Sequence, residues 1–265
     1  MSKLIQGLTR DYEKYFSSLE NALNEIIKVS VAARKAGHDP KPYPEIRIAE
    51  DLAGLVEGFI GIPKLADRIR VLLKRMSREK VAFKIAEEIV RGRFSNFDEE
   101  KSATYAIRAA LAILTEGVTA AVYSEGIAKV SIKSNMDGSH YLAIYFAGPI
   151  RSAGGTETAL TPVVADFVRQ LLGLDRYKPT EDEINRFVEE LRLYEREVGR
   201  FQYHVSDDNV RKALRHIPVE ITGIPSDNVE VSSYRNLSRV ETNCLRGGAL
   251  RVVNDGIVGL SLIHI

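Results

Sequence analysis

The sequence predicts an α+β protein in which a helical amino-terminal module precedes an α/β module. Apolar residues recur at spacings of three and four through the first third, whereas β-branched and aromatic runs begin beyond Gly117. We therefore expect one module over residues 1–117 and another over 118–260, with 261–265 as an anomalous tail. The chain has 265 residues, of which 45% are hydrophobic, so it can bury a substantial core.

Glycine and proline divide the first module into successive helices. The first helix follows the apolar stripe from Tyr12 to Ser30 and ends at Gly37, before a proline-rich break over 38–45. The last begins near Ser95, Asn96 or Asp98, each a candidate N-cap. Between them the pattern predicts a short helix from Ile48, a helix containing Leu65 to Leu73, and a helix over 78–91.

The second module begins with two strands joined by an Asp137-Gly138 hairpin turn. The second of these strands, over 140–150, is almost wholly apolar and is expected to be buried. Thr180 is a candidate cap for a helix with an acidic first turn. The remaining expected elements are a helix over 160–171, a short helix from Ser206, strands over 219–223 and 227–235, and a final helix broken at Gly247 and Gly248.

Composition limits the classes of function. The net charge of +1 supplies no global attraction to nucleic acid, so any such contact needs a local patch. There is one cysteine, Cys244, and the five histidines show no metal-binding spacing. No stretch resembles a signal peptide or a membrane span. We expect a cytoplasmic protein with no catalytic residue, metal ligand or cofactor of its own.

The segment FAGPIRSAGGTE, residues 146–157, is a candidate anion site. Glycines ahead of a helix let backbone N–H groups approach a phosphate, and an arginine adds a forked donor. The segment is neither a P-loop nor a dinucleotide-binding fingerprint. The alternative is a tight strand-to-helix turn with the arginine paired to an acid. The residues concerned are Arg151 and the turn glycines Gly148, Gly154 and Gly155.

A second candidate lies in RVETNCLRGGALRVVNDGI, residues 239–257. Two arginines flank a glycine pair and are candidate DNA contacts, with internal ion pairs as the alternative: Arg246 and Arg251, around the turn glycines Gly247 and Gly248. Asn254 to Gly256 is expected to form a plain turn. Catalytic use of Glu241 and Asp255 is not expected, because sequence spacing does not show that they converge.

The run from Lys64 to Arg93 is the most basic part of the chain, with ten cations against four acids. Such a surplus can follow a phosphate backbone, and the alternative is a solvated helix face. Within it, GFIGIPKLADRI is similar to a helix-hairpin-helix loop, although Pro63 replaces the usual second glycine. The candidate DNA contacts are Lys74, Arg75 and Arg78.

The long motifs YFAGPIRSAGGTE and VETNCLRGGALRVVNDGI resemble those of the large subunits of archaeal family-D DNA polymerases. The opening YEKYFSSLENALNEIIKVSVAARKAGHDPKPYPEI and the stretch EDLAGLVEGFIGIPKLADRIR resemble the same family. The resemblance covers residues 5–259. The last residues, LSLIHI, depart from the family pattern, in which more basic residues are expected after Gly259.

The resemblance implies an amino-terminal accessory region of a replicative polymerase made of a large and a small subunit. Its α/β part is expected to resemble a KH module and to support subunit assembly and binding of a primer-template. The magnesium-dependent polymerase centre and the zinc modules would lie downstream, and the 3′-to-5′ exonuclease would belong to the small subunit. The chain by itself is then expected not to polymerise DNA.

Two rival functions remain open at this stage. One is a pure protein-docking module that binds the small subunit or a second copy of the chain. The other is a nuclease or nucleotide-binding enzyme that uses the GPIRSAGGTE loop. DNA binding that weakens steeply with salt would argue against the first rival, because a pure docking module has no DNA affinity to lose. Magnesium-dependent turnover abolished by Arg151→Ala would support the second.

Overall fold

The computed structural model describes residues 9–38, 49, 51–115, 126–148, 150 and 155–259, with the side chains of 155–157 left aside. Its helices and strands confirm the predicted α+β class, with a helical first part followed by strands. The elements are α1 (Arg10–Lys35), α2 (Leu52–Ile60), α3 (Leu65–Leu73), α4 (Arg78–Val90), α5 (Glu99–Leu114), β1 (Ile127–Ser134), β2 (His140–Phe146), α7 (Gly155–Leu171), α8 (Glu181–Glu197), α9 (Asp207–His216), β3 (Glu220–Gly223), β4 (Asp227–Glu230), β5 (Cys244–Leu245), α10 (Gly247–Arg251) and a π-helix (Val252–Gly259).

Several predicted helix boundaries are confirmed by their caps. Asp98 accepts a hydrogen bond from the Lys101 backbone N–H at the start of α5. Thr180 and Glu183 form a capping box at the start of α8. Gly37 has a positive φ of 82° just after α1, as a helix-ending glycine should.

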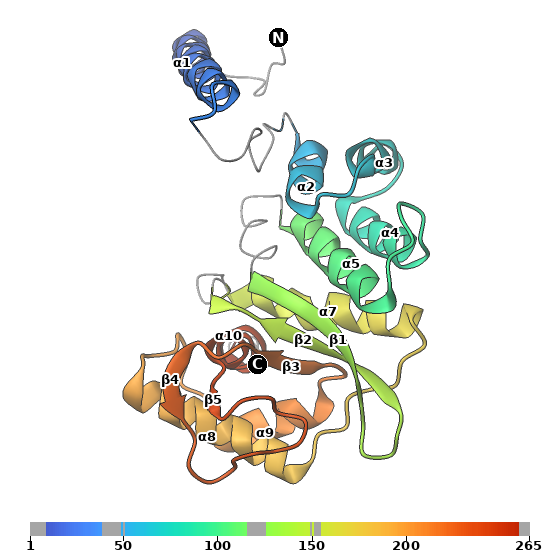
Figure 1. Ribbon diagram of the computed structural model, residues 1–265, viewed down its shortest axis with the longest axis vertical. Coiled ribbons are helices and arrows are strands. Elements are labelled where there is room, and N and C mark those ends of the chain that lie inside the picture. The colour runs from blue at the N-terminus through green and yellow to red at the C-terminus, as the bar shows by residue number, and fades with distance from the viewer. Residues whose placement is uncertain are drawn as a thin grey trace.

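Two sheets organise the second half of the chain. β1 and β2 form an antiparallel hairpin around Gly138, and β3 pairs in parallel with β2, so the sheet order is β1-β2-β3. β4 and β5 form a separate antiparallel pair. Figure 1 shows α5 and α7 on one side of the three-stranded sheet and α8 and α9 on the other. β2 is buried on both faces, which confirms the buried strand expected from its apolar sequence.

The edge of β1 is sealed by side chains of α5. Glu100 Oε1 accepts the backbone N–H of Ile132 at 2.7 Å, and Thr104 Oγ1 accepts that of Val130 at 3.1 Å. Arg108 Nε donates to the carbonyl of Ile127 at 3.1 Å. These side chains occupy positions one helical turn apart, so one face of α5 replaces a neighbouring strand and satisfies an otherwise open edge.

One hydrophobic core runs through both predicted modules. Buried residues of α2 to α5 join those of β1, β2, α7, α8 and α10 in a single cluster. The predicted module boundary at 117–118 falls outside the described residues, so the division into two modules stays a prediction.

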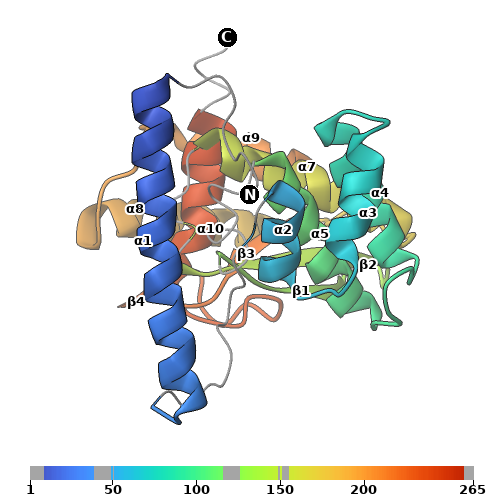
Figure 2. The ribbon, with the colours of Figure 1, turned by 90° about the horizontal axis from the view of Figure 1, so that it is seen from above.

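The first helix is arranged differently from the rest. None of the α1 residues is buried, and Figures 1 and 2 show it as a long rod at one side of the molecule. Below, "the body" means the described residues from 51 to 259.

Two predictions near the end of the chain are wrong. The expected helix broken at the glycine pair is a short strand, β5, followed by α10, which begins at Gly247. The expected plain turn at Asn254–Gly256 lies inside the π-helix. Asp255 there accepts the backbone N–H groups of Gln202 and Tyr203, so contacts with a distant loop override the local turn preference.

Candidate functional site

The two motifs singled out in the sequence pack against each other. A Cβ on Gly248 would lie 2.9 Å from the carbonyl oxygen of Ala147, and a Cβ on Gly256 would lie 2.2 Å from Thr158 Oγ1. Only glycine permits this approach, so α10 and the π-helix contact both ends of the 146–158 segment. Gly247 and Gly248 thus lie in the first turn of α10 and serve close packing.

The centre of the first motif, including Arg151, Pro149 and Gly154, lies outside the described residues. Gly148 and Gly155 flank it, and Gly155 begins α7. A phosphate contact by this loop therefore stays a prediction.

The second motif places Arg246 inside the protein. Its side chain is 4% exposed, Nη2 donates to Glu190 Oε1 at 2.7 Å, and Nη1 donates to Thr222 Oγ1 at 2.8 Å. Burial opposes the charge, but the charge and hydrogen bonds of Glu190, together with the nearby Glu220, raise the pKa of Arg246. This is the internal ion pair that the alternative interpretation anticipated. The sequence did not reveal this pair, because Glu190 lies on α8, far from Arg246 along the chain.

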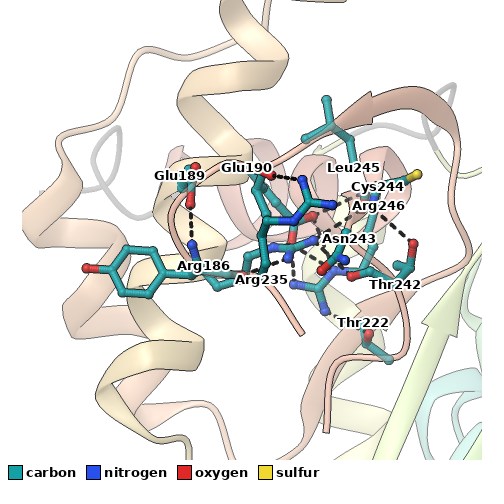
Figure 3. A network of polar contacts seen from close by, with 12 residues as sticks. Arg186, Glu189, Glu190, Thr222, Arg235, Thr242, Asn243, Cys244, Leu245 and Arg246 are labelled. Atoms are coloured by element: carbon teal, nitrogen blue, oxygen red, sulfur yellow. Dashed lines mark hydrogen bonds and ion pairs between the residues drawn. The ribbon is translucent and has the colours of Figure 1, made fainter. Parts of the chain in front are cut away.

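Glu190 is shared with a second fully buried arginine, Arg186, as Figure 3 shows. Arg186 Nε donates to Glu190 Oε1 at 2.8 Å, and its terminal nitrogens donate to the carbonyls of Tyr234 and Thr242, each at 2.9 Å. All three guanidinium nitrogens therefore donate to backbone or carboxylate oxygens, as a buried charge requires.

A second set of charges continues this network under the sheet. Arg239 Nε donates to Glu183 Oε1 at 2.7 Å, and Lys133 pairs with Glu220 at 2.9 Å. Tyr141 donates its hydroxyl to Glu220 at 2.9 Å. Burial and then the nearby Glu220 charge raise the pKa of Tyr141, so it stays a neutral donor at physiological pH.

Arg251 is held on the body by several contacts. Its Nη1 donates to Asp255 at 2.9 Å and its Nη2 to the carbonyl of Arg200 at 2.6 Å. The guanidinium also lies over the rings of Tyr194 and Phe201, which stack on each other. With a side chain 23% exposed and already engaged, Arg251 fits the internal alternative better than a DNA contact.

The basic run divides into paired and unpaired cations. Arg68 pairs with Glu88, and Arg70 makes a two-point contact with Asp51. Lys84, Arg91 and Arg93 pair with acids of α4. Among the described residues of this run, the exposed cations without an ion pair are Lys64, Lys74, Arg75 and Lys80.

Three of these unpaired cations lie around the connection between α3 and α4, whereas Lys64 lies at the start of α3. Lys74 ends α3, Arg75 follows it, and Lys80 lies in the first turn of α4. Arg78 is half-buried in the same turn, with its Nε fully covered by protein. We call Lys74, Arg75 and Lys80 the basic corner.

The similarity to a helix-hairpin-helix loop has a structural counterpart without an obvious phosphate site. α2 and α3 flank a tight turn in which Gly61 and Lys64 have positive φ. At the start of α3, however, the Glu57 carboxylate accepts the backbone N–H of Ala66 at 2.8 Å. The protein's own carboxylate thus occupies a position where such a loop would hold an anion.

Sequence reasoning missed most of the buried network. The one local signal was the i, i+4 spacing of Arg186 and Glu190 on a helix whose apolar residues include Phe187 and Leu191. The other partners, Glu183 with Arg239 and Lys133 with Glu220, are far apart in sequence, and spacing does not reveal them.

The described residues contain no cluster of three or more histidine, cysteine or acidic side chains that would hold a metal ion. Within the same residues, no helix is long and apolar enough to cross a membrane. What they define is an α+β scaffold in which both ends of the first motif pack against the second, with a buried ion network inside and a basic corner on its surface.

Comparison with known proteins identifies the scaffold. Residues 14–262 match the family described as "DNA polymerase II large subunit DP2, N-terminal". The chain belongs to this family, which confirms the resemblance drawn from its motifs.

Curated relatives agree with the family match. The chain is 54% identical over 250 residues to the DNA polymerase II large subunit of Methanosphaera stadtmanae, covering 92% of this chain and 22% of the relative. It is 51% identical over 254 residues to that of Pyrococcus furiosus, covering 95% and 20%. Identity to the Methanococcus vannielii protein is 49% over 250 residues, covering 94% and 22%. The chain thus spans about a fifth of the length of these relatives.

Proposed function

We propose that this chain is the amino-terminal accessory region of the large subunit of a replicative archaeal DNA polymerase. In that role it supports subunit assembly and contributes a contact to the DNA backbone. The family match supports the polymerase context. The basic corner, where the exposed cations have no ion partner among the described residues, carries the proposal of a DNA contact.

We propose that the catalytic chemistry of the parent polymerase lies outside this chain. We propose that nucleotidyl transfer with Mg²⁺ and the zinc modules belong to the part of the large subunit that this chain does not span. The 3′-to-5′ exonuclease is proposed to belong to the small subunit. For the described residues, which bring no metal-binding cluster together, we propose a non-catalytic role.

The first helix supports the assembly role. Its apolar residues alternate in steps of four and three along one stripe, the spacing of a helix that packs lengthwise against another. Their side chains are 39–65% exposed, so the stripe is open for a partner: Tyr12, Phe16, Leu19, Leu23 and Ile26. We propose the small subunit as the partner, with a second copy of this chain as the alternative.

DNA binding is tested by titrating the chain with a labelled primer-template across a salt series. The double variant Lys74→Glu/Arg75→Glu should weaken binding at least tenfold at low salt and reduce the steepness of the salt dependence by about 2, because each phosphate contact contributes about 1 to the slope. The matched control reverses two exposed cations of other helices, Arg196→Glu and Lys212→Glu, and should bind like the parent chain.

If both double variants lose affinity equally, the contact is diffuse and the basic corner is not the site. If the unmodified chain does not bind at low salt, the DNA role fails and the docking role remains. The enzyme rival is tested with the same samples: magnesium-dependent turnover of DNA or nucleotide, lost in Arg151→Ala, would support it. We expect no turnover.

A further inference from the structure

The segment 231–243, here called the anchored loop, connects β4 to β5 without any helix or strand of its own. β4 and β5 are antiparallel neighbours, and a hairpin of two to five residues would join such strands. The fold therefore does not need a connection of this length. Ordered loops this long without regular structure are uncommon in compact proteins and are usually functional.

The start of the anchored loop is fixed by one carboxylate of α8. Glu189 accepts the backbone N–H groups of Ser232, Ser233 and Tyr234 at 2.7, 2.9 and 3.1 Å. These three hydrogen bonds to a charged acceptor set the direction of three successive peptide groups. Burial is the largest single influence on the pKa of Glu189 and raises it, but these hydrogen bonds together lower the pKa below its usual value.

Two further sets of contacts fix the rest of the loop: one from the buried Arg186, and one between Asn236 and Asn243. Arg186 donates to the carbonyls of Tyr234 and Thr242 (Figure 3 shows Arg186 and Thr242). Asn236 and Asn243 are joined by two hydrogen bonds. The Asn236 backbone N–H donates to Asn243 Oδ1 at 2.9 Å, and Asn243 Nδ2 donates to Asn236 Oδ1 at 2.8 Å.

This anchoring has a substantial cost. It buries the charges of Arg186 and Glu190 completely, whereas apolar side chains of similar volume would stabilise a core equally well or better. A short hairpin packed on an apolar α8 would be the cheaper solution. What the buried charges do provide is a fixed loop shape, because Arg186 holds two of the loop carbonyls.

The loop turns small polar side chains toward solvent. Its exposed residues are Ser232, Ser233, Arg235, Asn236, Ser238 and Glu241. Asn236 is engaged by Asn243, and Glu241 accepts the Tyr145 hydroxyl, so the hydroxyls of Ser233 and Ser238 are the groups best placed to make adaptable hydrogen bonds at low entropic cost, as serines do in antibody paratopes. Arg235 is already paired with Glu230 at 2.6 Å, and Glu241 adds a negative charge. The loop therefore fits a polar protein surface and not a phosphate backbone.

We propose that the anchored loop docks against the remaining part of the same large subunit, which makes up about four-fifths of the relatives' length. The loop exposes six residues, whereas a stable contact between separate proteins uses about 20–30 residues on each side. Contacts between domains of one chain are smaller and more polar, and the covalent link supplies an effective concentration of about millimolar. The proposal rests on family membership and is independent of the DNA contact.

The test compares the exposure of one loop atom in two settings. In a Cys244→Ala background, Ser238→Cys introduces a single thiol at an exposed position of the loop, and Ser95→Cys introduces one on the exposed connection between α4 and α5 as control. Each variant is prepared as this chain alone and as the amino-terminal part of a full-length large subunit completed with the Pyrococcus furiosus sequence. The rate of reaction with a maleimide is measured for all four proteins.

The expected result is that the thiol at 238 reacts at least tenfold more slowly in the full-length subunit, whereas the thiol at 95 reacts equally in both. Slower hydrogen exchange of the 235–238 amides in the full-length subunit should accompany it. Equal rates at 238 overturn the proposal, as does a slow rate in the isolated chain. Protection that requires added small subunit or duplex DNA overturns it too, because the occupant is then a different molecule.

Discussion

The first helix and α5 carry the same kind of sequence pattern and end in opposite environments. Both are amphipathic, yet α1 buries none of its residues, whereas α5 buries nine. The apolar side of α5 is made largely of alanine with a few larger residues such as Ile107 and Leu111, and it contacts α4, α7 and β1. The stripe of α1 is made of Tyr, Phe, Leu and Ile with no cover of comparable extent. Amphipathic spacing therefore shows which face of a helix seeks a partner, but not whether the partner lies in the same chain.

The largest effect is expected in the buried ion network, far from α1. Arg186→Ala leaves Glu190 with one cation fewer and two backbone carbonyls without their donor. Breaking a buried ion pair typically costs about 3–5 kcal/mol. Urea unfolding of the chain measures the loss.

The control for this prediction is on the same helix. Arg196→Ala removes an arginine whose side chain is 71% exposed, and it should change the free energy of unfolding by less than about 0.5 kcal/mol. A loss below about 1 kcal/mol for Arg186→Ala would mean that the network relaxes or takes up water, and the argument for an imposed loop shape would weaken with it.

The second prediction sets α5 directly against α1. Leu111→Ala in α5 should lower the free energy of unfolding by about 2–5 kcal/mol, because it empties a fully buried site. Leu23→Ala in α1, where the side chain is 51% exposed, should change it by less than about 0.5 kcal/mol. Thermal or urea unfolding of the two variants gives both numbers.

The same pair separates folding from assembly. Leu23→Ala should weaken association with the small subunit, measured by analytical ultracentrifugation, while the unfolding of the body stays unchanged. A Leu23→Ala variant that is as destabilised as Leu111→Ala would show that α1 folds back on the body. The exposed stripe of α1 would then belong to an open state of the molecule and not to its resting state.

The sequence was a good guide where a structure depends on neighbouring residues. The caps at Asp98 and Thr180, the hairpin at Gly138 and the buried strand β2 all follow from residues within a few positions of each other. These features are local competitions for backbone hydrogen bonds, so the residues that decide them are visible in a short window.

The sequence was a poor guide where a charge finds its partner far away. Arg246 was a reasonable candidate for DNA because arginine is usually exposed, but its partner Glu190 lies on another helix. The cations at Lys74 and Arg75 looked the same in sequence and stay exposed, because Asp67, Glu87 and Glu88 pair with other cations. Whether a charge faces solvent or a buried partner is decided by tertiary contacts.

The smallest predicted effect concerns the best-buried ion pair of the helical half. Hydrogen bonding to Arg68 holds the pKa of Glu88 below its usual value of 4.5, and burial opposes this. A group whose pKa is depressed by folding stabilises the protein above its unfolded-state pKa, and this contribution is lost as the pH falls through the folded-state pKa. Glu88→Gln should therefore cost about 1–2 kcal/mol at pH 7, in line with one hydrogen bond to a charged group.

The difference in the free energy of unfolding between Glu88→Gln and the parent chain should narrow as the pH falls below the unfolded-state pKa of Glu88 and through its lower folded-state pKa, because only then is Glu88 protonated in the folded chain as well. Urea unfolding at a series of pH values between 7 and 3 follows the gap. Glu25→Gln in α1 is the matched control: Glu25 pairs with Lys28, but both side chains are 71% exposed, and such pairs contribute little. A gap for Glu88→Gln that is independent of pH would attribute its cost to packing and not to the charge. The Glu88–Arg68 and Glu25–Lys28 ion pairs would then differ in burial but not in what their charges contribute to the free energy of unfolding.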